Sequence, residues 1–332
     1  MITINPIFPC KSPVSWVGNK SPILGIILAL MPLDCPRFVD VFGGSGTVTL
    51  GKPPGNDFEV YNDFDGNLVN LFRCMKKCPL SVIRELGFLT LNSRDDFIVL
   101  RRFINQEEFN DEFFEQEMQL TQITLPHLEA DEISQLMLGK SKDYKVIRAC
   151  NYLKLLRYSY SSGGKSFASQ PFDIRKLFHL IWQTHARLSN VVIENKDFED
   201  LIKHYDRENT VFYLDPPYYQ TEGMYAQAFT KEDHYRLFET LKSAKGKWLL
   251  SYNDCEFIRD LYRDYSIFEF SRVHSMAQRY EAGKQFPELL IGNYDLYERE
   301  RNKPYQMTLF GHEEFDYEKI LKECILQCKI RL

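Results

Sequence analysis

Short apolar segments alternate along this chain with segments of helical periodicity, and this alternation constrains the fold more than any other feature. The apolar segments are Arg37–Phe42, Phe58–Tyr61, Val191–Ile193, Thr210–Leu214, Lys247–Tyr252 and Leu289–Tyr294. Helical patterns cover 21–31, 67–77 and 231–244. Strands that alternate with helices form a mostly parallel sheet with helices on both faces. The sequence therefore predicts an α/β fold.

Two of the helices carry recognisable start signals. Ser21 stands before Pro22 at the start of the first helix, as an N-cap residue does. Thr230 precedes the helix over 231–244, and Asp233 lies near the third position of a capping box. Both signals favour helices that begin at these residues.

The length of 332 residues suggests about two domains. Residues 79–187 read as mainly helical and polar, interrupted by the turn signal Ser161–Gly164. We expect them to be inserted into an α/β domain formed by residues 1–78 and 188–300. Residues 301–332 are predicted to be a C-terminal tail with a final helix.

The formal net charge of −5 argues mildly against nucleic acid, but the charge is unevenly distributed. Residues 103–139 contain nine acidic residues and no Lys or Arg, whereas residues 140–187 carry a net charge of +8. A basic block beside an acidic one is typical of a protein with one surface that faces a polyanion. A solvated helix face explains the same pattern equally well.

Eight cysteines are scattered through the chain without a C-x-x-C pair, so we expect reduced thiols and no metal site. No apolar run approaches the roughly 20 residues that a membrane helix needs. We therefore expect a cytoplasmic protein without a membrane partner.

Polar residues cluster where the predicted strands end, which is where ligands bind in open parallel sheets. Phe42-x-Gly44-x-Gly46 follows one strand, and its glycines allow a backbone to approach a ligand closely. Asp63 ends the next strand, where an acid can accept both hydroxyls of a ribose. Each feature also has a structural explanation, a tight turn or a helix cap. Together they favour a ribose-bearing cofactor, either NAD or S-adenosylmethionine.

The segment Asp215-Pro216-Pro217-Tyr218 decides between these cofactors. Two prolines fix the backbone and remove two N–H donors. An exocyclic amine has two N–H groups, and the Asp215 carboxylate and the Pro216 carbonyl can accept both. Tyr218 can stack on the base that carries the amine. A purely structural Pro-Pro loop does not require the flanking acid and aromatic.

These motifs resemble the Dam-like D12 class of DNA adenine-N6 methyltransferases. Further similarities are Ser15–Lys20, Phe38–Gly46, Asn62–Asn70, Asn195–Phe198, Arg279-Tyr280 and Glu288–Asn293. The glycine loop precedes Asp-Pro-Pro-Tyr, as in the alpha arrangement of this class. The resemblance implies a Rossmann-like S-adenosylmethionine-dependent methyltransferase sheet with an inserted, mainly helical target-recognition domain.

The resemblance also implies roles for individual residues. The catalytic residues would be Asp215, Pro216, Pro217 and Tyr218. Those that bind S-adenosylmethionine would be Trp16, Lys20, Phe42, Gly44, Gly46, Asp63, Asp197, Phe198 and Asp215. Trp16 and Lys20 would hold the methionine end, and Asp197 the adenine amine. The structural alternative is a core anchor at position 16 and a helix cap at position 197, where both roles can coexist.

The expected partner is double-stranded DNA, contacted by Arg157, Tyr160 and Lys165 of the basic block. The segment 157–167 does not match the Dam hairpin, so a GATC target is not supported. Val41 stands where the family usually has Pro, and Asn19 replaces a common Gly, without loss of a ligand group. The resemblance also allows for a companion restriction endonuclease.

The chemistry predicted from these residues is methyl transfer to N6 of a flipped-out adenine, because a base inside a duplex cannot reach such a pocket. The nearest alternatives are cytosine-N4 methylation and methylation of adenine in RNA. A catalytically silent DNA-binding module would have a broken Asp-Pro-Pro-Tyr motif, which is intact here. An NAD-dependent dehydrogenase would need a hydride-transfer site, which this motif does not supply.

Overall fold

The computed structural model describes residues 10–16, 18–32, 35–55, 57–87, 94–105, 145–159, 166–167, 173–219, 229–273 and 285–298. The chain divides into two compact units. Unit 1 comprises Met1–Ser12, Gly18–Asp65 and Ala186–Leu332, and unit 2 comprises Pro13–Val17 and Gly66–His185. The site that the sequence predicts at the strand ends belongs mainly to unit 1.

Unit 1 is built on a seven-stranded sheet in the order β3-β2-β1-β4-β5-β7-β6. The strands are β1 (Arg37–Asp40), β2 (Phe58–Asn62), β3 (Val191–Glu194), β4 (Thr210–Leu214), β5 (Lys247–Asn253), β6 (Ser266–Val273) and β7 (Gln285–Gly292). The first five pair in parallel, and β7 runs antiparallel to both β5 and β6. The strands expected from the sequence are confirmed, and β6 is an additional one.

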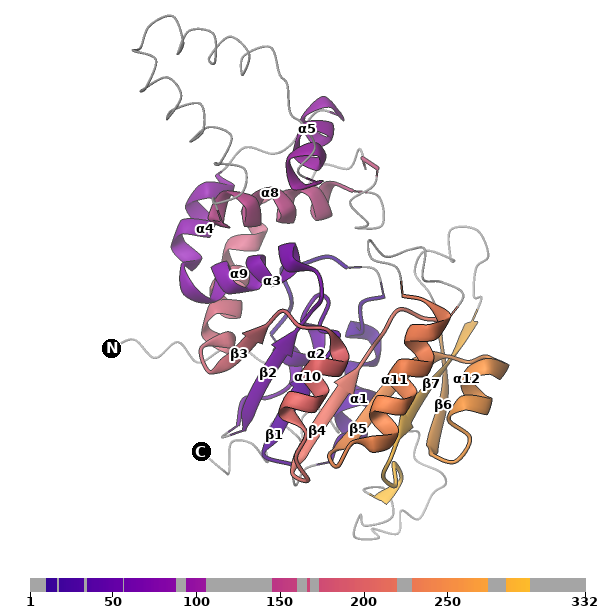
Figure 1. The fold of residues 1–332 in the computed structure, drawn as a ribbon. Coiled ribbons are helices and arrows are strands. Elements are labelled where there is room, and N and C mark those ends of the chain that lie inside the picture. Colours follow the sequence, from indigo (N-terminus) through magenta and orange to yellow (C-terminus); the bar gives the residue numbers. More distant parts are fainter. Residues whose placement is uncertain are drawn as a thin grey trace, which may run out of the picture. The chain divides into compact units, whose positions relative to one another are not determined.

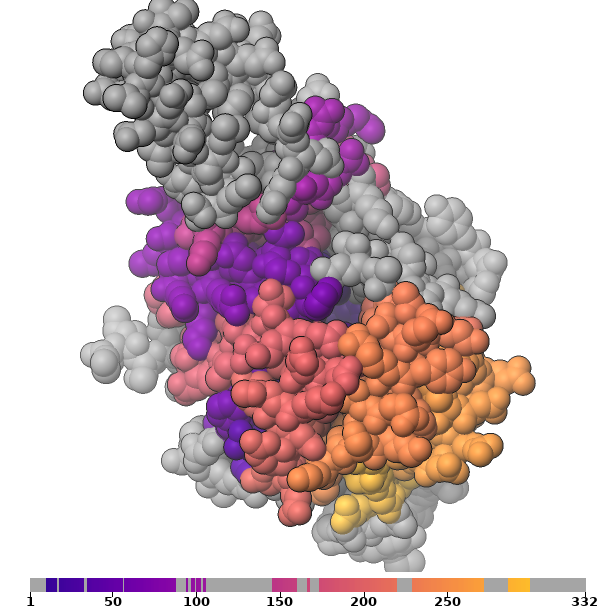
Figure 2. Space-filling model, in the orientation of Figure 1, coloured from indigo at the N-terminus to yellow at the C-terminus, as the bar shows by residue number. Residues whose placement is uncertain are grey.

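Alternate residues of the strands face two separate cores. One core joins Val39, Phe212 and Leu250 to the helices α10 (Phe198–Tyr205), α11 (Lys231–Ser243) and α12 (Glu256–Leu261). The other joins Phe38, Val211 and Leu249 to α1 (Leu24–Leu30) and α2 (Thr47–Gly51). Figure 1 shows α10 and α11 in front of the sheet and α1 behind it, and Figure 2 shows the outer surface of α10 and α11. The structure confirms the prediction that helices pack on both faces of the sheet.

The helix starts agree only partly with their sequence signals. Thr230 caps α11 in a full capping box with Asp233, as the sequence indicates. Ser21 does not act as an N-cap, because Ser21–Ile23 form a short 3-10 helix ahead of α1. The Ser21 hydroxyl instead donates to the side chain of Asn19 at 2.8 Å.

Unit 2 is helical where it is described. Its helices are α3 (Gly66–Lys77), α4 (Pro79–Leu86), α5 (Arg94–Asn105), α8 (Lys145–Tyr158) and the first part of α9 (Lys176–Leu188). Helices α3, α4 and α5 each pack against α8. Most of unit 2 runs from Gly66 to His185, and α3 packs against α8 within it. The inserted domain over 79–187 stays a prediction.

Parts of the prediction lie outside the described residues: Tyr160, Lys165, Arg279-Tyr280 and the tail over 301–332. Among the described helices, none is both long and apolar enough to cross a bilayer. The described His, Cys, Asp and Glu side chains form no cluster of three that would hold a metal ion.

Candidate active site

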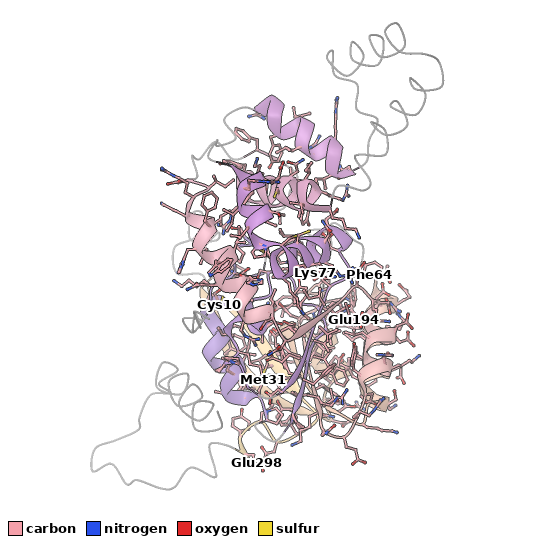
Figure 3. All side chains as sticks on the ribbon, turned by 90° about the vertical axis from the view of Figure 1, so that its left-hand side faces the viewer. Cys10, Met31, Phe64, Lys77, Glu194 and Glu298 are labelled. Atoms are coloured by element: carbon pink, nitrogen blue, oxygen red, sulfur yellow. The ribbon has the colours of Figure 1, made fainter. Side chains whose placement is uncertain are left out.

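The carboxyl ends of the parallel strands in unit 1 carry the residues that the sequence singles out. Two labelled residues in Figure 3 show where this edge lies: Phe64 follows β2, and Glu194 ends β3. Both lie on the same side of unit 1, whereas Glu298 lies at the opposite end. The register pairs Asp40 of β1 with Tyr61 of β2 and with Tyr213 of β4. Loops that leave these three strands are therefore neighbours.

The glycine loop after β1 is held tightly against the end of β2. Gly44 and Gly46 have φ values of 50° and 70°, in the region that favours glycine. Gly43 donates to the Asn62 carbonyl at 2.7 Å, and a Cβ at position 43 would lie 2.2 Å from the Tyr61 ring. The Tyr61 hydroxyl donates to the Gly44 carbonyl at 2.7 Å. The loop conformation thus depends on glycines for backbone and for steric reasons.

Asp63 holds this loop through its carboxylate. Its Oδ2 accepts from the Gly44 N–H at 2.9 Å, and its Oδ1 accepts from the Asp65 N–H at 2.8 Å. The bond from the Asp65 N–H resembles the helix cap that is the structural explanation for Asp63 in the sequence. Each carboxylate oxygen has two lone pairs, so the side chain can still accept from a ligand hydroxyl.

Two asparagines tie the neighbouring strand ends together. Asn62 donates to the carbonyls of Val41 and Lys196, at 2.9 and 3.1 Å, and accepts from the Lys196 N–H at 2.8 Å. Asn195 donates to the carbonyls of Asp63 and Phe64, at 2.8 and 3.1 Å. The loops after β1, β2 and β3 are therefore joined by amide hydrogen bonds.

Asp215 directly follows the fully buried β4. Its Oδ2 lies 2.8 Å from Lys20 Nζ, and the two side chains are 18% and 5% exposed. The ammonium also lies 4.8 Å from the centroid of the Tyr218 ring. The Tyr218 hydroxyl is 2.9 Å from Ser251 Oγ and donates to Glu288 Oε2 at 3.2 Å. The structure thus brings Lys20, Asp215 and Tyr218 together.

Aromatic rings gather beside the glycine loop. The ring centroids of Phe42 and Phe198 are 5.7 Å apart, and Phe229 lies 6.0 Å from the first and 5.9 Å from the second. The Arg236 guanidinium lies 4.2 Å from the centroid of the Phe198 ring. This arrangement suits a flat apolar ligand ring.

Asp197 has structural partners that the sequence shows only in part. Its Oδ1 accepts from the Glu199 N–H at 2.9 Å, which confirms the helix cap for α10. Arg236 adds a bidentate pair, with Nη1 2.9 Å from Oδ1 and Nη2 3.0 Å from Oδ2. Oδ1 is then saturated, and Oδ2 keeps one lone pair for a ligand amine.

A second carboxylate lies below the glycine loop. Asp40 is 1% exposed, and its Oδ2 accepts from the Thr49 hydroxyl at 2.7 Å. Burial raises the pKa of Asp40 to about 7, and the negative charges of Asp215 and Asp63 add to the increase. Burial also raises the pKa of Asp63 to about 6, against the lowering effect of its N–H donors. Asp40, Asp63 and Asp215 are therefore close enough to affect one another's ionisation.

The remaining predicted residues belong to unit 2. Trp16 is partly exposed in the segment Pro13–Val17. Arg157 donates through Nε and Nη2 to the Pro13 carbonyl, the former at 3.0 Å, and burial lowers the pKa of its guanidinium. Arg157 is therefore engaged within unit 2.

Sequence reasoning missed three residues of the site: Asp40, Phe64 and Arg236. Phe64 follows Asp63 and is 57% exposed, which is unusual for a phenylalanine. Its place directly after the predicted ribose acceptor was a readable signal. Asp40 was hidden within an apolar segment, and nothing in the sequence marks Arg236.

The site lies at the carboxyl ends of parallel strands, where open α/β sheets bind their ligands. Comparison with known proteins specifies the family. The family described as D12 class N6 adenine-specific DNA methyltransferase matches residues 16–276. This chain therefore belongs to that family.

Individual relatives agree with this assignment. The Type II methyltransferase M.CviBI of Paramecium bursaria Chlorella virus NC1A is 24% identical over 271 residues, 80% of this chain and 91% of its own. The Type II methyltransferase M1.LlaDCHI of Lactococcus lactis subsp. cremoris is 22% identical, over 84% of this chain and 94% of its own. The protein is thus an adenine-specific DNA methyltransferase, and it needs a methyl donor.

Gly43→Ala tests the packing of the glycine loop. The added Cβ would meet the Tyr61 ring and the Asn62 carbonyl, so the free energy of unfolding should fall by about 1–3 kcal/mol. Gly55→Ala is the matched control, because its Cβ would have only ordinary contacts, at 3.4 Å and beyond. Chemical denaturation measures both variants. Equal stability of the two would contradict the steric argument.

Asp40→Asn tests the buried carboxyl. The folded protein holds the Asp40 proton up to about pH 7, whereas an unfolded chain releases it near pH 4. Wild-type stability should therefore fall as pH rises from 4 to 7, by on the order of 4 kcal/mol from this group. In Asp40→Asn, the decrease in the free energy of unfolding between pH 4 and pH 7 should be smaller by this amount. Asp200→Asn, at an exposed position of α10, should show the same decrease as wild type. Parallel unfolding curves against pH for wild type and Asp40→Asn would refute the assignment.

Proposed function

We propose that this enzyme moves a methyl group from S-adenosyl-L-methionine to N6 of an adenine rotated out of duplex DNA, and that Asp215, Pro216, Pro217 and Tyr218 are its catalytic residues. The observation that carries the proposal is the position of Asp215. Its carboxylate stands at the end of a buried central strand, beside the strand that leads into the glycine loop.

The residues around the glycine loop fit the proposed cofactor. A loop with positive φ at Gly44 and Gly46 presents backbone rather than side chains to a ligand. Asp63 keeps acceptor capacity for ribose hydroxyls, and Lys20 supplies a buried cation for a carboxylate. S-adenosylmethionine supplies a methyl group already activated on a sulfonium, so the chain itself needs no covalent intermediate.

We assign the purine of the cofactor to the aromatic side of the loop. Phe42 and Phe198 form an apolar surface there, and Asp197 Oδ2 can accept from the purine amine. The exposed Phe64 ring adjoins the ribose acceptor and offers a further packing surface. Trp16 and Lys20 complete the set at the methionine end, as the family resemblance implies.

The target amine is a weak nucleophile because its lone pair is delocalised into the purine ring. Asp215 and the Pro216 carbonyl accept its two N–H groups, which raises electron density on nitrogen as positive charge develops there. Pro216 and Pro217 contribute no N–H that would compete. The Tyr218 ring, fixed through its hydroxyl, stacks on the extruded base and offsets part of the unstacking cost.

The inserted domain, proposed as residues 79–187, supplies the DNA surface through its basic block. Tyr160 and Lys165 are the proposed contacts to bases and phosphates. The engagement of Arg157 with Pro13 favours a role for this arginine at the base of that surface. We further propose a cytoplasmic location and, because its relatives are Type II methyltransferases, a companion restriction endonuclease.

Asp215→Asn tests the central assignment. The amide replaces one acceptor oxygen by a donor, so methyl transfer to DNA should fall at least about 100-fold, in line with loss of a transition-state hydrogen bond. DNA affinity should change far less. Release of labelled methyl groups into nucleosides, analysed by mass spectrometry, measures transfer and separates N6-methyladenine from N4-methylcytosine. Turnover near that of wild type would refute the role of Asp215.

Lys165→Ala tests the DNA surface. Loss of one phosphate contact should weaken DNA binding and reduce the slope of log K against log salt by about 1. Lys245→Ala serves as the control, because Lys245 is an exposed lysine just before β5, at the amino end of that strand. Fluorescence anisotropy over a salt series measures both. An unchanged slope for Lys165→Ala would remove this residue from the interface.

A further inference from the structure

Arg236 of α11 joins the starts of two helices that lie side by side in front of the sheet (Figure 1). Its Nη1 donates to Asp197 Oδ1 at 2.9 Å and to Glu199 Oε2 at 3.3 Å. Its Nη2 donates to Asp197 Oδ2 and to Asp233 Oδ1, both at 3.0 Å. Asp197 is the N-cap of α10, and Asp233 belongs to the capping box of α11. One guanidinium thus fastens both helix starts to each other.

The donors of Arg236 are largely used up by these contacts. An arginine side chain has five N–H groups, and four of them belong to Nη1 and Nη2. The four bonds to Asp197, Glu199 and Asp233 equal these four groups in number. Arg236 therefore acts on a bound ligand through the carboxylate that it holds, rather than by hydrogen bonds from these two nitrogens.

The Asp197 carboxylate is held at both of its oxygens. Besides the pair with Arg236, its Oδ1 accepts from the Glu199 N–H at 2.9 Å. A carboxylate has about four lone-pair sites, so one site on Oδ2 is left for a ligand. A rotation of the carboxylate would break the bidentate pair or the helix cap. The direction of the remaining lone pair is therefore fixed by Arg236 and the cap together.

Arg236 also holds the apolar surface beside this acceptor. Its guanidinium lies 4.2 Å from the centroid of the Phe198 ring, within the range of an attractive cation–π contact. Phe198 directly follows Asp197, and its ring centroid is 5.7 Å from that of Phe42. One side chain thus positions both the hydrogen-bond acceptor and an aromatic ring of the proposed purine site.

Loss of Arg236 would have two opposing effects on a purine amine. Its positive charge weakens Asp197 as an acceptor, so its removal would strengthen the hydrogen bond if charge alone mattered. Its two hydrogen bonds also hold the carboxylate in one orientation. The side chains of Arg236 and Asp197 are 39% and 28% exposed, so water screens the charge and would solvate a released carboxylate. We therefore expect the loss of orientation to outweigh the gain in charge.

We propose that Arg236 is a specificity-determining positioning residue. It aims the available lone pair of Asp197 Oδ2 at the purine amine, so that the enzyme binds an adenine-bearing cofactor in preference to a hypoxanthine-bearing one. This inference rests on the proposed binding of the cofactor purine beside Asp197. It goes beyond that proposal because it assigns the selectivity to the orientation of the carboxylate and not to its charge.

The test compares two ligands that differ at the purine amine. S-adenosyl-L-homocysteine carries the amine, and S-inosyl-L-homocysteine carries a carbonyl oxygen in its place. Neither donates a methyl group, so calorimetry measures their affinities without turnover. Wild type should bind the first ligand at least about tenfold more tightly, as expected for a hydrogen bond to a charged acceptor. In Arg236→Lys and Arg236→Ala, this ratio should fall below about threefold.

The ratio of the two affinities is the decisive quantity, because partial unfolding of a variant lowers the binding-competent fraction equally for both ligands. Arg236→Lys keeps the charge but cannot form the bidentate pair. Lys242→Ala is the matched control, because it removes an exposed cation from the last turn of the same helix. Its ratio should equal that of wild type.

Two results would overturn the inference. A wild-type ratio in Arg236→Lys would mean that the charge suffices without the fixed geometry. A wild-type or larger ratio in Arg236→Ala would mean that orientation by Arg236 contributes nothing to the selectivity. Should Arg236→Ala not fold, the ratio of Arg236→Lys decides alone.

Asp197→Asn separates failure of this inference from failure of the proposed purine site. An amide can donate to the hypoxanthine carbonyl, so the preference for adenine should vanish or reverse in this variant. If wild type shows no preference, or if Asp197→Asn keeps it, the purine does not bind at Asp197, and that assignment fails together with the inference. If Asp197→Asn loses the preference and both Arg236 variants keep it, the purine site stands and only the role of Arg236 is refuted.

Discussion

The parallel hydrogen-bonded register between β1 and β4 is the constraint on which the site depends. It places Asp40 opposite Tyr213, and the pairing extends one step further through the Val41 N–H, which donates to the Tyr213 carbonyl at 2.9 Å. The glycine loop and the Asp-Pro-Pro-Tyr segment leave the sheet directly beyond this point. A shift of one residue would turn Asp215 to the other face, away from Lys20. The two loops can therefore form one site only because strands far apart in sequence are in register.

The strands, the glycine loop and Asp215 were predictable from the sequence because each leaves a local signal. Apolar runs mark buried parallel strands, and turn residues mark where they end. Strand β6 was missed because the run Ser266–Val273 mixes polar and apolar residues at the edge of the sheet, where burial is one-sided. The start of α1 was misjudged because Ser21 donates to Asn19 instead of capping the helix.

The electrostatic partners within the site were not predictable, because they are tertiary contacts without a sequence pattern. Lys20 and Asp215 lie far apart in the chain, as do Asp197 and Arg236, and no spacing rule connects either pair. Asp40 reads as an ordinary end of an apolar strand until its burial is known. Local motifs thus specify which groups reach the edge of the sheet, and the packing of the strands decides which charges oppose one another.

Asp197 illustrates how a structural role and a proposed functional role can share one side chain. Its carboxylate caps α10 and pairs with Arg236 of α11, and these contacts take three of its four lone pairs. The remaining lone pair has a direction fixed by the other three, because neither oxygen can rotate without loss of a hydrogen bond. In the proposed function, a single acceptor held in this way would discriminate between a purine that offers an amine and one that does not. The helix cap, which the structure shows, is therefore compatible with the ligand contact that we propose, and it would make that contact selective.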